Sequence, residues 1–290
     1  MIKLKKLSLK NYCGYHSAEF DFSTKKNTLK NLVCFFGPNG CGKTTLLTAI
    51  NVVSSAPRFY GRGYDLFFRK MTYHPDYEPS YERYQDVKNK MELIGIFDVD
   101  GCDKETVITT EGLVKNELPT DHMEYSYFID ADHPMNTHKF QLHEDMDDVF
   151  VDIAKTVYGY DCYLDKKVND IDEEENVFYT DFVIVKPDGT KVHYRRMSAG
   201  ERKIATLLRN LCNPLYMSYL DILLVDNFCM HIYKDRHAQM VNKLLDIFPE
   251  KQFFITTHSP VLVGMKDVEL GINIPAFLDA ESLVDVELIH

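Results

Sequence analysis

Residues 37–44 read Gly-Pro-Asn-Gly-Cys-Gly-Lys-Thr and decide the fold of this chain. The apolar run Leu32–Phe36 precedes them and a helical pattern begins at Lys43, which is the strand, loop and helix order of a phosphate-binding loop. Glycines let backbone N–H groups turn inward around phosphate oxygens, and the start of the helix adds its positive end. The Lys43 side chain can reach the β- and γ-phosphates, and the Thr44 hydroxyl is suited to ligate Mg²⁺. This stretch therefore predicts a nucleoside triphosphate site on an α/β fold.

Residues after 198 predict a parallel sheet with a carboxylate at its ligand-binding edge. Helical and apolar strand patterns alternate there, at residues 198–212, 222–225, 234–247 and 253–256. This alternation is typical of parallel strands that are joined by helices. Asp226 directly follows one strand pattern, so we expect its carboxylate at the carboxyl end of that strand. Together with the glycine-rich loop, Asp226 predicts a further oxygen ligand for Mg²⁺.

The stretch 55–190 reads as a long insertion between these two parts. Asp100-Gly101 and Asp188-Gly189 each lie between two strand-like runs, which predicts two β-hairpins. A helical pattern covers residues 148–158. The sequence holds no heptad run, which excludes a long coiled coil.

Composition and charge narrow the class of protein. The chain has 290 residues, of which 45% are hydrophobic, and a net charge of −11. Residues 101–190 hold 7 Lys and Arg against 22 Asp and Glu, so they argue against a broad basic face for nucleic acid. No apolar stretch approaches the roughly 18 residues of a membrane span. Seven cysteines without a CxxC pair are typical of free thiols in a reducing compartment, so we expect a cytoplasmic protein without a membrane partner.

Two further motifs carry a resemblance to a known family. Residues 197–201, Met-Ser-Ala-Gly-Glu, resemble the signature motif of ABC-type ATPases, and residues 257–260, Thr-His-Ser-Pro, resemble their switch-histidine segment. The order of phosphate loop, signature, aspartate and switch histidine is similar to that of the ABC ATPase fold. The form of these motifs is more similar to the SMC, RecF and OLD branch of DNA repair and defence systems than to transporters. The resemblance covers residues 1–50 and 191–265.

The resemblance implies a fold and a division of the chain into parts. The expected fold is an α/β P-loop NTPase with an ABC-ATPase-type mixed sheet and a compact α+β insertion lobe instead of a coiled coil. The chain would be a single head over residues 1–290. Its parts would be the ATP-binding residues 1–54, the insertion lobe 55–190, and residues 191–290 with the signature, the aspartate and the switch histidine.

The resemblance also implies the ligands and the site residues. Two copies would hold ATP and Mg²⁺ between them, so that ATP links a homodimer or a higher oligomer and hydrolysis releases it. The nucleotide would lie on Gly37, Pro38, Asn39, Gly40, Cys41, Gly42, Lys43, Thr44 and Thr45 of one copy and face Ser198, Ala199, Gly200 and Glu201 of the other. The catalytic residues would be Lys43, Asp226, Asn227 and His258. The metal ligands would be Thr44, Asp226 and Gln85, with Gln141 as the alternative glutamine.

Two positions depart from the family pattern. Asn227 stands where the family carries a Glu that acts as general base or orients the attacking water. An amide can orient water but cannot accept its proton, and general-base assistance contributes about 10²- to 10⁴-fold, so we expect slow turnover. Asn227 is either the native residue or a substitution that traps the ATP-bound state. Cys13 and Gly14 occupy the stretch where this branch often has an Arg that contacts nucleotide.

Two functions stay open at this point. In the first, the chain is a nucleotide-gated regulator in a prokaryotic or phage defence-type system, with a separate effector such as a nuclease as its protein partner. In the alternative, it is a DNA repair or recombination ATPase that clamps DNA directly. Residues 58–70 interleave basic and aromatic side chains, as proteins that bind single-stranded nucleic acid do. With 18 Tyr and 18 Phe in the chain, we favour the alternative of a partly buried loop that packs its aromatic side chains on the core. The acidic middle of the chain and the missing Glu favour the first function.

Overall fold

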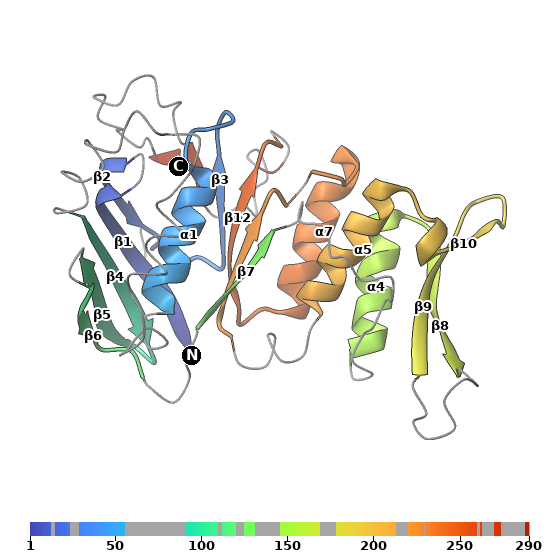
Figure 1. Ribbon diagram of the computed structural model, residues 1–290, viewed down its shortest axis with the longest axis horizontal. Coiled ribbons are helices and arrows are strands. Elements are labelled where there is room, and N and C mark those ends of the chain that lie inside the picture. Colours follow the sequence, from blue (N-terminus) through green and yellow to red (C-terminus); the bar gives the residue numbers. More distant parts are fainter. Residues whose placement is uncertain are drawn as a thin grey trace.

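In the computed structural model, the described residues form three sheets with helices between them (Figure 1). It describes residues 1–12, 15–23, 29–55, 91–109, 112–119, 125–130, 146–168, 178–212, 220–228, 230–259, 262, 270–273 and 288–289. Within these ranges, no helix is long and apolar enough to cross a membrane.

A six-stranded sheet forms the centre, in the order β14-β13-β3-β12-β11-β7. All neighbouring strands in it are parallel except the pair β13 and β14. Every residue of β11 is buried, because helices and a second sheet cover both faces, and this explains its continuous apolar sequence. The parallel sheet expected from the sequence is thus confirmed. Its strands are β3 (Leu32–Phe36), β7 (Ser126–Asp130), β11 (Ile222–Asp226), β12 (Gln252–Thr257), β13 (Leu270–Asn273) and β14 (Leu288–Ile289).

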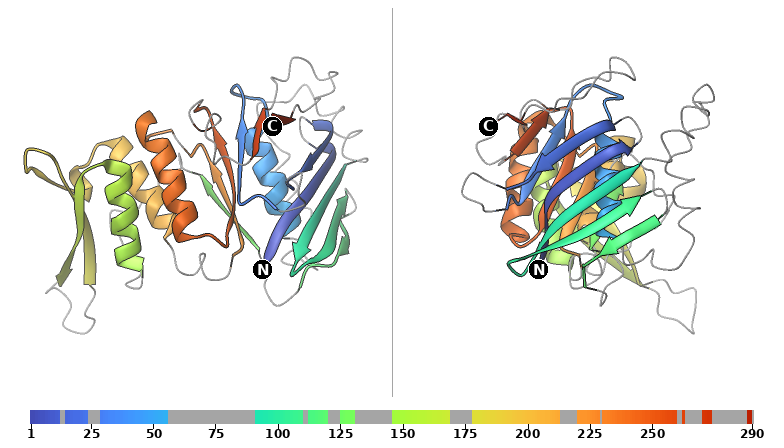
Figure 2. Two further views of the ribbon diagram at one scale, coloured as in Figure 1. Left: turned by 180° about the vertical axis from the view of Figure 1, so that it is seen from behind. Right: turned by 90° about the vertical axis from the view of Figure 1, so that its left-hand side faces the viewer.

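Helix α1 (Lys43–Ser54) lies between the central sheet and an antiparallel sheet, as Figures 1 and 2 show. Leu46, Leu47 and Ile50 of this helix belong to a buried cluster that includes residues of both sheets. The helix is therefore held on two sides, which fixes the phosphate loop at its start. The antiparallel sheet consists, in spatial order, of β2 (Tyr15–Asp21), β1 (Ile2–Tyr12), β4 (Glu92–Val99), β5 (Cys102–Thr109) and β6 (Gly112–Asn116).

The contact between α1 and β4 depends on Gly95. A Cβ atom at this position would lie 2.7 Å from a ring carbon of Phe97 and 3.0 Å from a methyl group of Val53. We expect Gly95→Ala to lower the free energy of unfolding by about 1–3 kcal/mol, because the extra methyl overpacks this contact. Gly200→Ala is the control, since a Cβ atom added at Gly200 would have no neighbouring atom within 4 Å. Urea unfolding of the two variants tests this, and equal stability would contradict the expected overpacking.

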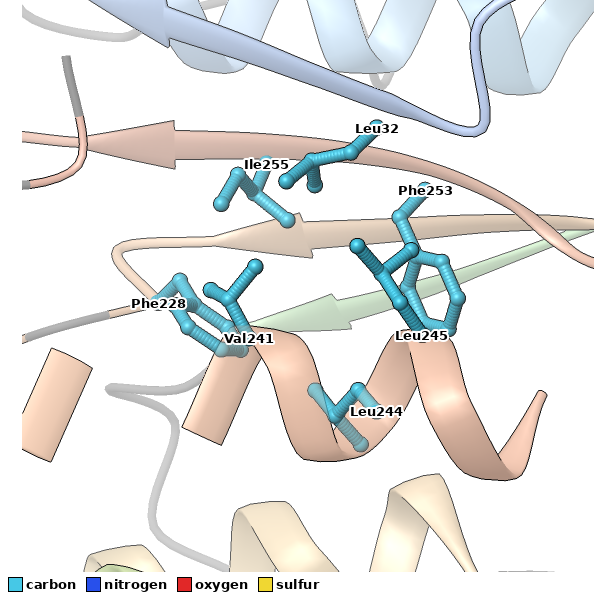
Figure 3. A pocket seen from close by; sticks show the side chains of 7 residues that line it. All are labelled: Leu32, Phe228, Val241, Leu244, Leu245, Phe253 and Ile255. Carbon is cyan, nitrogen blue, oxygen red and sulfur yellow. The ribbon is translucent and has the colours of Figure 1, made fainter. Parts of the chain in front are cut away.

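Helices α7 and α5 pack on the opposite face of the central sheet, and α4 packs on these two helices (Figure 1). Figure 3 shows how α7 packs there, with Leu32, Phe228, Val241, Leu244, Leu245, Phe253 and Ile255 around an apolar seam. A third sheet, in the order β10-β9-β8, lies beyond the helices. These elements are α4 (Asp147–Tyr158), α5 (Ala199–Leu211), α7 (Lys234–Ile247), β8 (Asp161–Val168), β9 (Phe178–Val185), β10 (Lys191–His193) and the short 3₁₀ helix η4 (Tyr194–Arg196).

The stretch 55–190 contributes to all three sheets. Strand β4 pairs with β1 and extends that sheet through β5 and β6, and β7 pairs with β11. Among the described residues of the stretch, α4, β8 and β9 lie with β10 and α5. Both predicted hairpins are confirmed, and their turns use left-handed backbone at Asp100, Gly101 and Gly189. Sequence patterns predicted the hairpin of β4 and β5 but not its partner sheet, because strand pairing is set by distant residues. The division of the chain at residues 54 and 190 stays a prediction.

Candidate functional site

The phosphate loop connects β3 to α1. Gly40 and Gly42 have φ angles of 78° and 94°, which side chains with a Cβ rarely adopt, and Gly42 is the residue that caps α1. The buried Tyr15 of β2 donates its hydroxyl to the Gly42 carbonyl oxygen at 3.1 Å. The loop thus has the conformation that its glycines predict, and the antiparallel sheet supports it from outside.

Lys43 lies inside this loop. Its side chain is 7% exposed, and its Nζ donates to the Gly37 carbonyl at 3.0 Å and to the Pro38 carbonyl at 2.8 Å. The Sγ of Cys41 lies 3.8 Å from the same nitrogen. The ammonium group is therefore held among the backbone atoms that a phosphate would face, so the residues present fit a phosphate-bearing ligand.

Asp226 meets Thr44 at the carboxyl ends of the parallel strands. The Thr44 Oγ1 donates to the Asp226 Oδ2 at 2.8 Å, and the Thr256 hydroxyl donates to the other carboxylate oxygen. Asp226 is 4% exposed, so these two hydroxyls take the place of water as hydrogen-bond donors to its carboxylate. A carboxylate beside a hydroxyl is the oxygen donor set that Mg²⁺ prefers, so this pair fits a magnesium site. Thr256 is a neighbour of Asp226 that sequence reasoning missed.

Asn227 begins the loop after β11. Its φ angle is 54°, in the left-handed region where Asn is favoured among residues with a side chain. Its N–H donates to the Thr256 Oγ1 at 2.8 Å, and its carbonyl accepts from the Met230 N–H at 3.0 Å. The backbone conformation gives one physical reason for Asn at this position.

His258 follows β12 and stands near the phosphate loop. Partial burial and the positive charge of Lys43 lower the pKa of His258, against the opposing effects of a hydrogen bond with the Gly37 backbone and of Asp226. Its imidazole is therefore neutral at pH 7 and offers one donor and one acceptor. Lys43, Asp226 and His258 thus lie within electrostatic reach of one another at the same edge of the central sheet.

The signature residues form the start of α5. Ser198 and Glu201 make a capping box, in which the Glu201 N–H donates to the Ser198 Oγ at 3.3 Å and the Ser198 N–H donates to the Glu201 Oε2 at 2.8 Å. Ala199 and Gly200 fill the first turn between them.

Two residues of the stretch 55–190 bind to this first turn. Lys186 forms an ion pair with Glu201, and the Tyr158 hydroxyl donates to the Glu201 carbonyl at 2.6 Å. Burial raises the pKa of Glu201, but hydrogen bonds from Lys186 and Ser198 outweigh it, so that the pKa is lowered. Sequence patterns gave no sign of these two contacts, since both join residues far apart in the chain.

The signature and the phosphate loop do not meet within one chain. The buried residues of α1 and of α5 belong to separate clusters on opposite faces of the central sheet (Figure 1). The structure therefore brings together residues 37–45, Asp226, Asn227 and His258, and places Ser198–Glu201 elsewhere. Gln85, Gln141 and the stretch 58–70 lie outside the described residues.

Comparisons with known proteins agree with this geometry. A family model described as an AAA domain matches residues 6–99. The Septu protein PtuA from Bacillus thuringiensis is 22% identical over 334 aligned positions, which cover 99% of this chain and 80% of PtuA. The DNA replication and repair protein RecF from Parabacteroides distasonis is 51% identical over 51 residues, which cover 18% of this chain and 12% of RecF.

A solved structure shares the whole fold. The SMC head domain from Thermotoga maritima aligns over 99% of both chains with a TM-score of 0.60 and 15% sequence identity. At this identity the likeness concerns the fold alone. Taken with the order of the four motifs, these findings show that the chain has the fold of an ABC-type ATPase head and is similar in sequence to PtuA and RecF.

Proposed function

We propose that the chain binds ATP and Mg²⁺ at residues 37–45, associates with a second copy through the bound ATP, and hydrolyses it slowly. The observation that carries this proposal is the division of the site between two faces. Lys43, Asp226 and His258 gather at one edge of the central sheet, whereas Ser198 stands on a helix that packs on the face opposite α1. A signature segment that cannot reach its own phosphate loop is suited to complete the site of a neighbouring copy.

Each residue has a distinct role in this proposal. The backbone N–H groups of residues 39–42 and the start of α1 hold the phosphates, while Lys43 exchanges its two carbonyl partners for phosphate oxygens. Thr44 and Asp226 would hold Mg²⁺, and the ion would supply positive charge beside the phosphates. The neutral His258 either accepts from the attacking water or donates to the γ-phosphate.

The slow turnover follows from Asn227 in the same proposal. Its half-buried amide can orient water next to the carboxylate of Asp226, but it cannot take the proton of that water. A long-lived ATP-bound state then results, and the association of two copies lasts as long as the nucleotide does.

Variants of Ser198 test the association of two copies. Ser198→Ala removes both the cap of α5 and the hydroxyl hydrogen that would reach the γ-phosphate, so we expect a loss of about 1 kcal/mol in stability and no ATP-dependent dimer. Ser198→Asp keeps an oxygen that caps the helix but adds a negative charge, so the fold should stay stable while the dimer is lost.

Light scattering with and without ATP and Mg²⁺ measures this association. The wild-type protein should double its mass on addition of the nucleotide, and neither variant should do so. A wild-type protein that stays monomeric in both conditions contradicts the proposed association. So does an Asp variant that dimerises as the wild type does.

For the biological role, we propose control of a separate effector protein, such as a nuclease, in a prokaryotic or phage defence-type system. The similarity to PtuA along 99% of the chain supports this role over DNA repair, since the match to RecF is confined to 51 residues. Co-purification of the tagged protein with its native partner, in ATP and in ADP, tests it. Nucleotide-dependent DNA retention in filter binding, with a steep negative salt dependence, favours the direct DNA clamp instead.

A further inference from the structure

His237 is a buried titratable residue with no role in the site described so far. It stands in the first turn of α7 with 3% of its surface exposed, and both ring nitrogens have a partner. The Nδ1 lies 2.7 Å from the Ser259 Oγ, and the Nε2 lies 2.8 Å from the Ile232 carbonyl oxygen. Because a carbonyl only accepts, the Nε2 donates to Ile232, and the Nδ1 shares a hydrogen bond with the Ser259 hydroxyl.

The two partners of His237 belong to the two loops that carry Asn227 and His258. Ser259 directly follows His258, and its N–H donates to the Thr257 Oγ1 at 2.9 Å. Ile232 lies near the end of the loop that Asn227 begins. The hydrogen bonds of His237 therefore join the end of one loop to the end of the other.

Thr256 joins the same two loops at their beginning. Its Oγ1 accepts from the Asn227 N–H at 2.8 Å, and its carbonyl oxygen accepts from the Phe228 N–H at 3.1 Å. The loop 227–232 and the segment 256–259 are thus bonded at both ends. Helix α7, which carries His237, is itself fixed on the central sheet by the apolar seam of Figure 3.

We infer that His237 is a positioning residue for ATP hydrolysis, because its bond to Ser259 fixes the backbone of His258 against the loop of Asn227. This inference rests on the proposed function, since the position of these two side chains affects a rate only when ATP is hydrolysed beside them. Substrate binding by the phosphate loop does not depend on the bond, because His237 contacts neither the loop nor its supports among the described residues.

Removal of either partner should lower the rate and leave substrate affinity intact. We expect His237→Ala and Ser259→Ala each to lower kcat about tenfold with less than about twofold change in KM for ATP, because the catalytic groups lose their alignment. The double variant should lose no more than about twofold beyond the single variants, since all of them break one bond. His237→Gln should regain activity, because its amide oxygen can accept from Ser259 while its N–H donates to Ile232.

Leu244→Ala is the matched control for packing. It loosens α7 within the same seam without touching the hydrogen bonds of His237, so it should lower the melting temperature and leave kcat unchanged well below that temperature. A fall in kcat equal to that of His237→Ala would assign the effect to packing and overturn the inference. Alanine variants with wild-type kcat overturn the inference alone, whereas a wild-type protein that takes up no ATP in calorimetry overturns the proposed function as well.

Discussion

Replacement of Lys43 by methionine is expected to weaken ATP binding about 10- to 10²-fold, because a hydrogen bond between charged groups contributes about 1.5–3 kcal/mol. The Lys43 ammonium lies inside the loop, within hydrogen-bond distance of the Gly37 and Pro38 carbonyl oxygens. Methionine keeps the apolar stem of this buried side chain and removes the charge, so the fold should survive. Titration calorimetry with ATP and Mg²⁺ measures the loss.

Lys191→Ala serves as the control for a general loss of positive charge. Lys191 is exposed at the start of β10, in the sheet farthest from the phosphate loop (Figure 1), so its removal should leave ATP binding unchanged. Equal affinities of the wild type and the Lys43→Met variant would show that ATP binds elsewhere or not at all. That result would contradict the proposed function, because ATP binding by residues 37–45 is its first step.

The second large effect is expected from Asn227→Glu, which should raise the turnover number at least about tenfold. A carboxylate at this position supplies the proton acceptor that the amide lacks, and such assistance contributes about 10²- to 10⁴-fold in favourable geometry. The gain should be smaller than this range, because the φ angle of 54° suits Asn better than Glu. We also expect a loss of up to about 1 kcal/mol in stability from the same strain.

Asn227→Gln separates these two effects. Gln has nearly the same shape and backbone strain as Glu but no proton acceptor, so it should share the loss of stability without the gain in rate. Steady-state phosphate release measures both variants beside the wild type. Equal turnover of the Glu and Gln variants would mean that another group, such as His258, already handles the proton.

The phosphate loop could be found from the sequence because its conformation is local. Glycines at residues 40 and 42 are required by the φ angles of a turn that spans a few residues, and the helix that follows continues from that turn. The same holds for the capping box of Ser198 and Glu201, whose bonds join residues three positions apart. The hairpin turns at Asp100-Gly101 and at Gly189 are local for the same reason.

Strand β7 was missed by the sequence patterns. Its five residues, Ser126–Asp130, form a run too short for periodicity to separate strand from helix or loop. Its place at the edge of the central sheet is set by pairing with β11, almost a hundred positions away, from Ile222↔Ser126 to Asp226↔Asp130. Such pairing depends on burial and register, which neighbours in sequence do not encode.

The amino-acid sequence by itself determined the phosphate loop, the capped signature helix, the aspartate at a strand end and the order of these motifs, because each depends on residues a few positions apart. Only the tertiary structure decided which faces of the central sheet they occupy. In that structure Thr256 bonds to Asp226 and Asn227, His237 bonds to Ser259, and Lys186 pairs with Glu201. These contacts join residues 15 to 30 positions apart on different elements, so they exist only after the strands have paired and the helices have packed on them.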